Sequence, residues 1–191
     1  MNDAQPQQTY QVRFDWGTAG FQALAAEADV IVIADALPPT TEHGAHFSGR
    51  LSGRTDAESA VILPATLNNR TAVAEWVLAR QAEKGARFSV VVIAAGERRA
   101  DGALRFAVED LFVAGAVIDA LSTLGIDHCS PEAAAASASF VGLQRALRHL
   151  ISASETGMAL ASQGRQSEIQ RASQIDGSTE VAAAEEFHFL A

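Results

Sequence analysis

A loop rich in charged residues follows the apolar segment 90–95 of this chain. After Gly96 it holds two acids and two arginines within five positions, which are Glu97, Arg98, Arg99 and Asp101. A hard cation such as Mg²⁺ binds through one or two carboxylates, and a guanidinium can hold a phosphate or sulfonate by two parallel hydrogen bonds. The loop therefore fits a magnesium ion and a phosphorylated acid, although each of these residues taken singly is also typical of a solvated turn.

Three further carboxylates stand near the ends of expected elements. Asp35 directly follows the β-branched segment 30–34. Glu109 and Asp110 lie near the start of an apolar segment that is expected to be helical. Ligands of an open parallel sheet bind beyond the carboxyl ends of its strands, which makes Asp35 a candidate ligand-binding residue. Two simpler interpretations stay open: Asp35 forms a turn before Pro38, and the acid pair only favours a helix start through the helix dipole.

Amide side chains mark another possible anion site. Asn68 and Asn69 follow the apolar segment 60–64, and Thr71 is expected to cap a helix over 72–84. Backbone amides at a helix start bind anions, and the asparagine amides could add donors. A plain turn with an N-cap explains the same residues equally well.

The spacing of apolar residues predicts the elements that must position these groups. Strands are expected at 10–14, 30–34, 60–64, 88–95 and 186–190, and helices at 21–27, 72–84, 105–124, 132–154 and 165–175. Residues 16–20 are expected to form a turn, and 48–59 an exposed loop. Strands separated by helices predict an α/β protein, a three-layer sandwich in which helices flank a mostly parallel sheet.

Composition narrows the class of protein further. The 191 residues are 48% hydrophobic, which predicts one domain at 10–191 after a disordered tail at 1–9. A net charge of −9 argues against nucleic acid or an anionic membrane as partner. The single cysteine, Cys129, excludes an intrachain disulfide, and we expect a soluble cytoplasmic protein. Apolar, alanine-rich helices after Ala114 predict a homo-oligomer. Dinucleotide and Walker glycine motifs are absent.

Four blocks of residues carry a recognisable order. They are 14–20 together with 28–37, then 67–74, then 95–116 with Glu109 and Asp110 inside it, and finally 171–176. In these blocks the chain resembles the 2-phosphosulfolactate phosphatase family, most specifically between Gly96 and Gly115. The resemblance implies a magnesium-dependent phosphatase that converts 2-phospho-3-sulfolactate to 3-sulfolactate, a step of coenzyme M biosynthesis.

The resemblance also implies roles for particular residues. Asp35, Asn68, Glu109 and Asp110 fall on family motif positions. Asp35 and Asp110 are then candidate catalytic residues, and together with Glu109 they are candidate Mg²⁺ ligands. Candidate substrate-binding residues are Thr40, Thr41, Asn68, Asn69 and Arg98.

The chain also departs from the family pattern. Pro38 stands where the family has an arginine, and a middle block of the family is compressed into 48–59. A relative that has lost catalysis and acts as a ligand-binding or oligomer-forming subunit is therefore the alternative.

Overall fold

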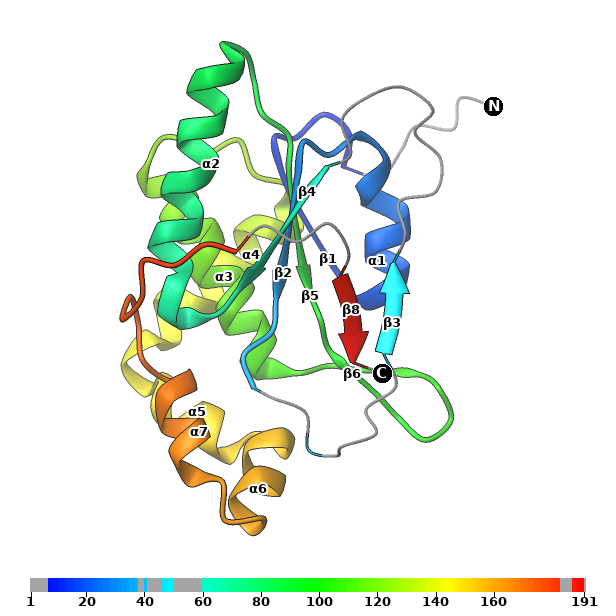
Figure 1. Cartoon of the computed structure of the whole chain (residues 1–191), viewed down its shortest axis with the longest axis vertical. Helices are drawn as coiled ribbons and strands as arrows, with labels where there is room; N and C mark the ends of the chain where they lie inside the picture. Colours follow the sequence, from blue (N-terminus) through cyan, green and yellow to red (C-terminus); the bar gives the residue numbers. More distant parts are fainter. Residues whose placement is uncertain (1–6, 38–39, 41–45, 50–59, 183–186, 191) are drawn as a thin grey trace.

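The computed structural model describes residues 7–37, 40, 46–49, 60–182 and 187–190, and it has a parallel sheet at its centre (Figure 1). The four strands of this sheet run in the order β1-β5-β2-β4. Their bounds are β1 Val12–Trp16, β2 Val30–Ala34, β4 Val61–Ala65 and β5 Val90–Ala94. Every residue of β2 and β5 is buried, which explains why both strands are continuous apolar runs.

Helices cover both faces of the sheet. On one face lies α1 (Gly17–Leu24), followed by a 3-10 turn (Ala25–Glu27), and it packs on side chains such as Ile31, Ile33 and Ile93. On the other face lie α2 (Arg70–Lys84), α3 (Val108–Thr123) and α4 (Pro131–Leu143). This arrangement confirms the α/β class, with a parallel sheet between layers of helices (Figure 1).

Helix α3 is buried between the sheet and α4. A Cβ atom at its Gly115 would collide with the backbone of Ala136, so the two helices approach closely. The apolar surface of α3 is therefore covered within the chain itself, whereas much of α4 is exposed, so the expected homo-oligomer stays a prediction.

Smaller elements extend the carboxyl edge of the sheet, where its strands end. A hairpin of β6 (Glu97–Arg98) and β7 (Leu104–Arg105) follows β5. Helices α5 (Leu147–Ala153), α6 (Glu155–Ser162) and α7 (Gln166–Ala172) lie beyond this edge (Figure 1). An antiparallel pair joins β3 (His46–Gly49) to β8 (Phe187–Leu190), which confirms the expected last strand. None of the described helices is long and apolar enough to cross a bilayer.

Several boundaries differ from those expected. Helix α1 begins directly at Gly17, whose positive φ of 54° lets the chain leave β1 without a separate turn. The helix expected at 132–154 breaks at a 3-10 turn (Gln144–Ala146), because residues 141–145 are all exposed and no packing holds a continuous helix there. The exposed loop expected at 48–59 was wrong at its start, since β3 includes 48–49, and 50–59 lie outside the described residues.

The start of α2 also differs from the expectation. The helix begins at Arg70, so Thr71 is not its cap. Thr66 caps the 3-10 turn Leu67–Asn69 just before it, and Asp176 accepts a hydrogen bond from the Thr71 backbone N–H at 3.1 Å. The segment that follows α7 thus satisfies a backbone N–H in the first turn of α2, which we had expected a local cap to satisfy.

Both edges of the sheet carry groups that stop further pairing. On β1, the side-chain amide of Gln7 donates to Phe14 O and accepts from Phe14 N, at 2.9 and 3.0 Å. Val12 is paired with the loop at His128 and Ser130. On the opposite edge, β4 contains Pro64, which has no N–H to donate.

Candidate active site

Asp110 joins the ends of the two central strands. It lies in the first turn of α3 and is 3% exposed. Its Oδ1 accepts a hydrogen bond from the N–H of Ala36, which follows β2, and its Oδ2 accepts one from the N–H of Gly96, which follows β5, both at 2.9 Å. The acids that sequence places far apart are therefore brought to one edge of the sheet.

Gly96 is required at this junction. Its φ is +64°, and an added Cβ would lie 2.7 Å from Leu104 Cδ1 and 3.0 Å from the carbonyl oxygen of Arg105. A side chain at this position would therefore be strained and would also push against the β6–β7 hairpin. Glycine lets the turn present its N–H to Asp110 while the hairpin packs over it.

Asp35 and Asp110 oppose each other's ionisation. Burial raises the pKa of Asp35 to about 7, and the charges of Glu97 and Glu109 raise it too, while a hydrogen bond from the Leu37 backbone acts in the other direction. Burial and the charge of Asp35 raise the pKa of Asp110 well above its ordinary value. At neutral pH the repulsion between the two carboxylates is therefore reduced either by a proton bound to one of them or by a cation bound beside them.

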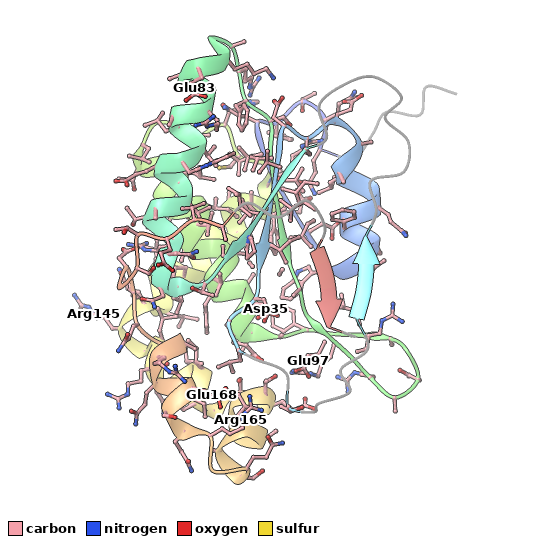
Figure 2. The ribbon with its side chains drawn as sticks, viewed as in Figure 1. Asp35, Glu83, Glu97, Arg145, Arg165 and Glu168 are labelled. Atoms are coloured by element: carbon pink, nitrogen blue, oxygen red, sulfur yellow. The ribbon has the colours of Figure 1, made fainter. Side chains whose placement is uncertain are left out.

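Arg105 is a buried guanidinium that contacts three glutamates at this edge of the sheet. It is 6% exposed, and its Nη2 lies 2.7 Å from Glu97 Oε2, 2.6 Å from Thr156 Oγ1 and 3.8 Å from Glu109 Oε1. Its Nη1 lies 3.6 Å from Glu155. Arg105 therefore connects α6 to a group of acids at this edge, which we call the acidic cluster and which consists of Asp35, Glu97, Glu109 and Asp110. Figure 2 labels Asp35 and Glu97 of this cluster.

The donor chemistry of the cluster fits a hard cation. Glu109 is 2% exposed, and its Oε2 is buried without a hydrogen-bond partner. Carboxylate oxygens are the ligands that Mg²⁺ prefers, and Mg²⁺ takes one or two of them while keeping several waters. Within the described ranges, no three His, Cys, Asp or Glu side chains are grouped closely enough to form a metal site by themselves. A metal ion held in this part of the structure would therefore have at most two of these side chains as ligands.

The other candidate residues lie elsewhere or have structural contacts. Arg98 is exposed on β6. The side chain of Asn69 accepts from the Thr66 N–H and donates to Pro64 O and Glu180 O. Asn68 has a buried Oδ1 without a partner, and Gly177 packs closely against it.

The two threonines are only partly described. Thr40 is half-buried, and its carbonyl accepts a hydrogen bond from Gln163, while Thr41 lies outside the described residues. Neither threonine side chain therefore adds a described contact to the acidic cluster.

Sequence reasoning missed Arg105 and its partner Thr156. The spacing of four between Arg105 and Glu109 was a usable signal, because such residues can pair along a helix start. Thr156 carried no signal, since α6 was not expected.

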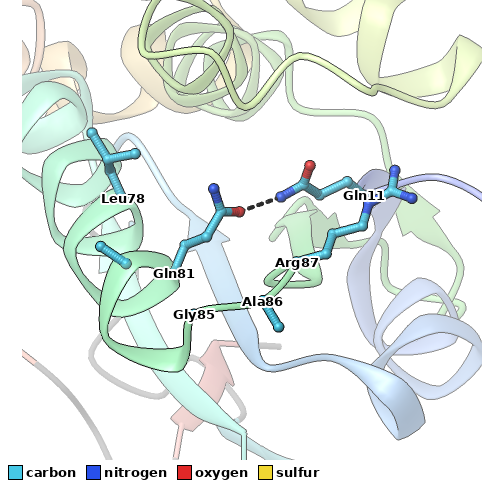
Figure 3. A pocket seen from close by; sticks show the side chains of 7 residues that line it. Gln11, Leu78, Gln81, Gly85, Ala86 and Arg87 are labelled. Carbon is cyan, nitrogen blue, oxygen red and sulfur yellow. Dashed lines mark hydrogen bonds between the residues drawn. The ribbon is translucent and has the colours of Figure 1, made fainter.

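A hollow of about 500 Å³ lies at the opposite edge of the sheet, between α2 and the start of β1 (Figure 3). It is lined by Gln11, Leu78, Gln81, Ala82, Gly85, Ala86 and Arg87, and Gln11 donates to Gln81 at 2.5 Å. No carboxylate or histidine is among these lining residues.

A comparison with protein families finds a match over most of the chain. A family model described as 2-phosphosulpholactate phosphatase matches residues 48–186, which includes Gly96, Arg105, Glu109 and Asp110. No curated protein matches the chain.

Proposed function

The chain belongs to the 2-phosphosulpholactate phosphatase family, and we propose on this premise that it hydrolyses the phosphate ester of a small acid, with 2-phospho-3-sulfolactate as substrate and Mg²⁺ as cofactor. The observation that carries the proposal is the double hydrogen bond of Asp110 to Ala36 and Gly96. These two bonds hold Asp110, with Asp35 and Glu109 near it, at the edge of the sheet where α/β proteins bind ligands.

Each residue of the cluster has a role in this proposal. Asp35 and Glu109 would hold the Mg²⁺, since Asp35 has a raised pKa and Glu109 has an unpartnered oxygen. An ion held by these two carboxylates would supply positive charge to offset the negative charge of the phosphate and of the leaving oxygen. Asp110 fixes the relative positions of the strand ends, and Arg105 adds a second positive charge beside Glu109.

Hydrolysis requires water to attack the phosphorus atom while the ester oxygen leaves and takes up a proton. Glu109 is buried and Asp35 is half-buried, so the attraction between these carboxylates and a bound cation would act in a setting of low dielectric, where it is strong. The products are inorganic phosphate and 3-sulfolactate.

The alternative is a family member that binds its ligand without turnover. It is favoured by the contacts of Arg105, whose guanidinium is already engaged by Glu97 and Thr156. In an active enzyme, this guanidinium has to exchange one of those partners for the phosphate, or stabilise the charge of the phosphate without a direct hydrogen bond to it.

Phosphate release from 2-phosphosulfolactate decides between the two. We expect release with Mg²⁺ and none with a chelator, and a loss of about 100-fold or more in Asp35→Asn and Glu109→Gln. The matched controls Asp127→Asn and Glu75→Gln remove exposed acids and should stay within about twofold of wild type. Equal turnover by wild type and Asp35→Asn would contradict the proposed site. Binding of the substrate without release by wild type would favour the alternative.

A further inference from the structure

Arg13 is a buried guanidinium far from the acidic cluster. It lies in the first half of β1, is 2% exposed, and donates from Nη2 to Ser89 Oγ at 2.6 Å. Its Nε is buried without a hydrogen-bond partner. A guanidinium has five N–H donors, and buried charges are normally paired, so this side chain is poorly compensated.

The nearest acids are engaged by other partners. Among the described residues, none of the ion pairs involves Arg13. Glu27 accepts from Gln8 Nε2 at 2.9 Å, and Asp29 binds Lys84 Nζ at 2.6 Å and the Ser89 N–H at 2.7 Å. Burial lowers the pKa of Arg13, and the charges of Glu27 and Asp29 only oppose this from a distance.

Arg13 lines a cavity of about 190 Å³. Its wall also includes Tyr10, Gln11, Glu27, Arg87 and Ser89. Two guanidinium groups thus face one small space, and Arg87 is held there by contact with the imidazole Nδ1 of His128. The volume is below the range of 300–1,000 Å³ that is usual for larger organic ligands. The cavity therefore suits a small ligand rich in acceptors.

This cavity is separate from the candidate active site. Arg13 pairs with Val91 in the sheet register, and Gly96 lies five residues further along the chain. At about 3.3 Å per residue, the two places are about 16 Å apart. Arg87 and Ser89 precede β5, so the cavity opens at the amino edge of the sheet.

We propose that this cavity is a binding site for a small oxyanion, a phosphate, sulfate or sulfonate group, with Arg13 as its anchor and Arg87 and Ser89 as supporting donors. The unsatisfied guanidinium is the group that such an anion pairs with, because oxyanions accept parallel hydrogen bonds from arginine. The site does not depend on the proposed phosphatase activity, since none of its residues belongs to the acidic cluster.

Isothermal titration with inorganic phosphate tests the proposal. The full chain is titrated in a chelator at constant ionic strength, so that the acidic cluster has no cation to attract phosphate. We expect one site, an affinity loss of tenfold or more in Arg13→Gln, and a smaller loss in Arg87→Gln. Arg105→Gln and the exposed control Arg145→Gln should bind as wild type does. Sulfate and methanesulfonate should compete with phosphate.

Three results would overturn the proposal. The first is that Arg13→Gln binds phosphate with the wild-type affinity. The second is that only Arg105→Gln loses phosphate binding. The third is that chloride gives the same binding signal in the titration as phosphate does. Should Arg13→Gln fail to fold, the Nε–H signal of Arg13 in the wild-type nitrogen-15 spectrum, assigned with Arg13→Lys, gives a second readout. That signal should shift on adding phosphate, and a signal that stays in place refutes the site.

Discussion

Replacing Asp35 with asparagine should stabilise the metal-free protein at alkaline pH. The pKa of Asp35 is raised from 3.8 to about 7, which means that the folded state binds the proton more tightly than the unfolded chain does. The stabilisation by the neutral carboxyl is fully present below about pH 4 and is lost as the pH rises through 7. About three pKa units at 1.36 kcal/mol each give an upper bound of about 4 kcal/mol.

Asparagine keeps the shape of the side chain and removes the charge. Because the charge of Asp35 also raises the pKa of Asp110, the substitution relieves both groups. We therefore expect Asp35→Asn to exceed wild type by about 2–4 kcal/mol at pH 8 and to match it within about 1 kcal/mol at pH 4. In a protein of this length, that corresponds to roughly 5–15 °C in melting temperature.

Urea unfolding in a chelator, followed by circular dichroism at pH 4 and pH 8, measures this difference. The control Asp127→Asn removes an exposed acid and should show no such pH dependence. A difference between wild type and Asp35→Asn that is the same at both pH values would refute the argument that burial opposes the charge of Asp35.

Mg²⁺ at ten times its dissociation constant should stabilise wild type at pH 8 by about 1.4 kcal/mol in urea unfolding, and a chelator or Glu109→Gln should remove the effect. Gly96→Ala should cost about 2–4 kcal/mol by the same assay, because φ is +64° and Leu104 lies close. Gly102→Ala isolates the conformational part, about 1–2 kcal/mol, since its φ is +82° and nothing lies within 4 Å; equal costs would contradict this reasoning. Arg105→Gln should lower stability by about 2–4 kcal/mol and abolish phosphate release, and full activity would exclude Arg105 from the site.

The central strands were the most predictable part of the fold. The strand expected at 30–34 is β2 to the residue, because a strand buried on both faces must be apolar and β-branched throughout. Helix ends were less predictable, since alanine favours a helix everywhere. The break after Leu143 follows from the exposure of 141–145, which is set by packing and not by local propensity.

The convergence of the acids could be expected, because parallel strands end at the same edge. The adjacency of β2 and β5 could not be read from the chain, since β4 lies between them in sequence. The register of the β6–β7 hairpin determines that Arg105, and not the predicted Arg98, lies beside Glu97. Glu97 pairs with Arg105, so Arg98 points to the other face, and a shift of one residue would have reversed the outcome.

The blocked edges of the central sheet limit how copies of this chain can associate. Outward N–H and C=O groups of β1 are occupied by Gln7 and by the loop at His128, and Pro64 interrupts the donors of β4. Unpaired edge strands are the usual starting points for aggregation and for continuous intermolecular sheets. Self-assembly through strand addition is therefore disfavoured at both margins, and the cap formed by Gln7 is a natural place to begin testing resistance to fibril growth.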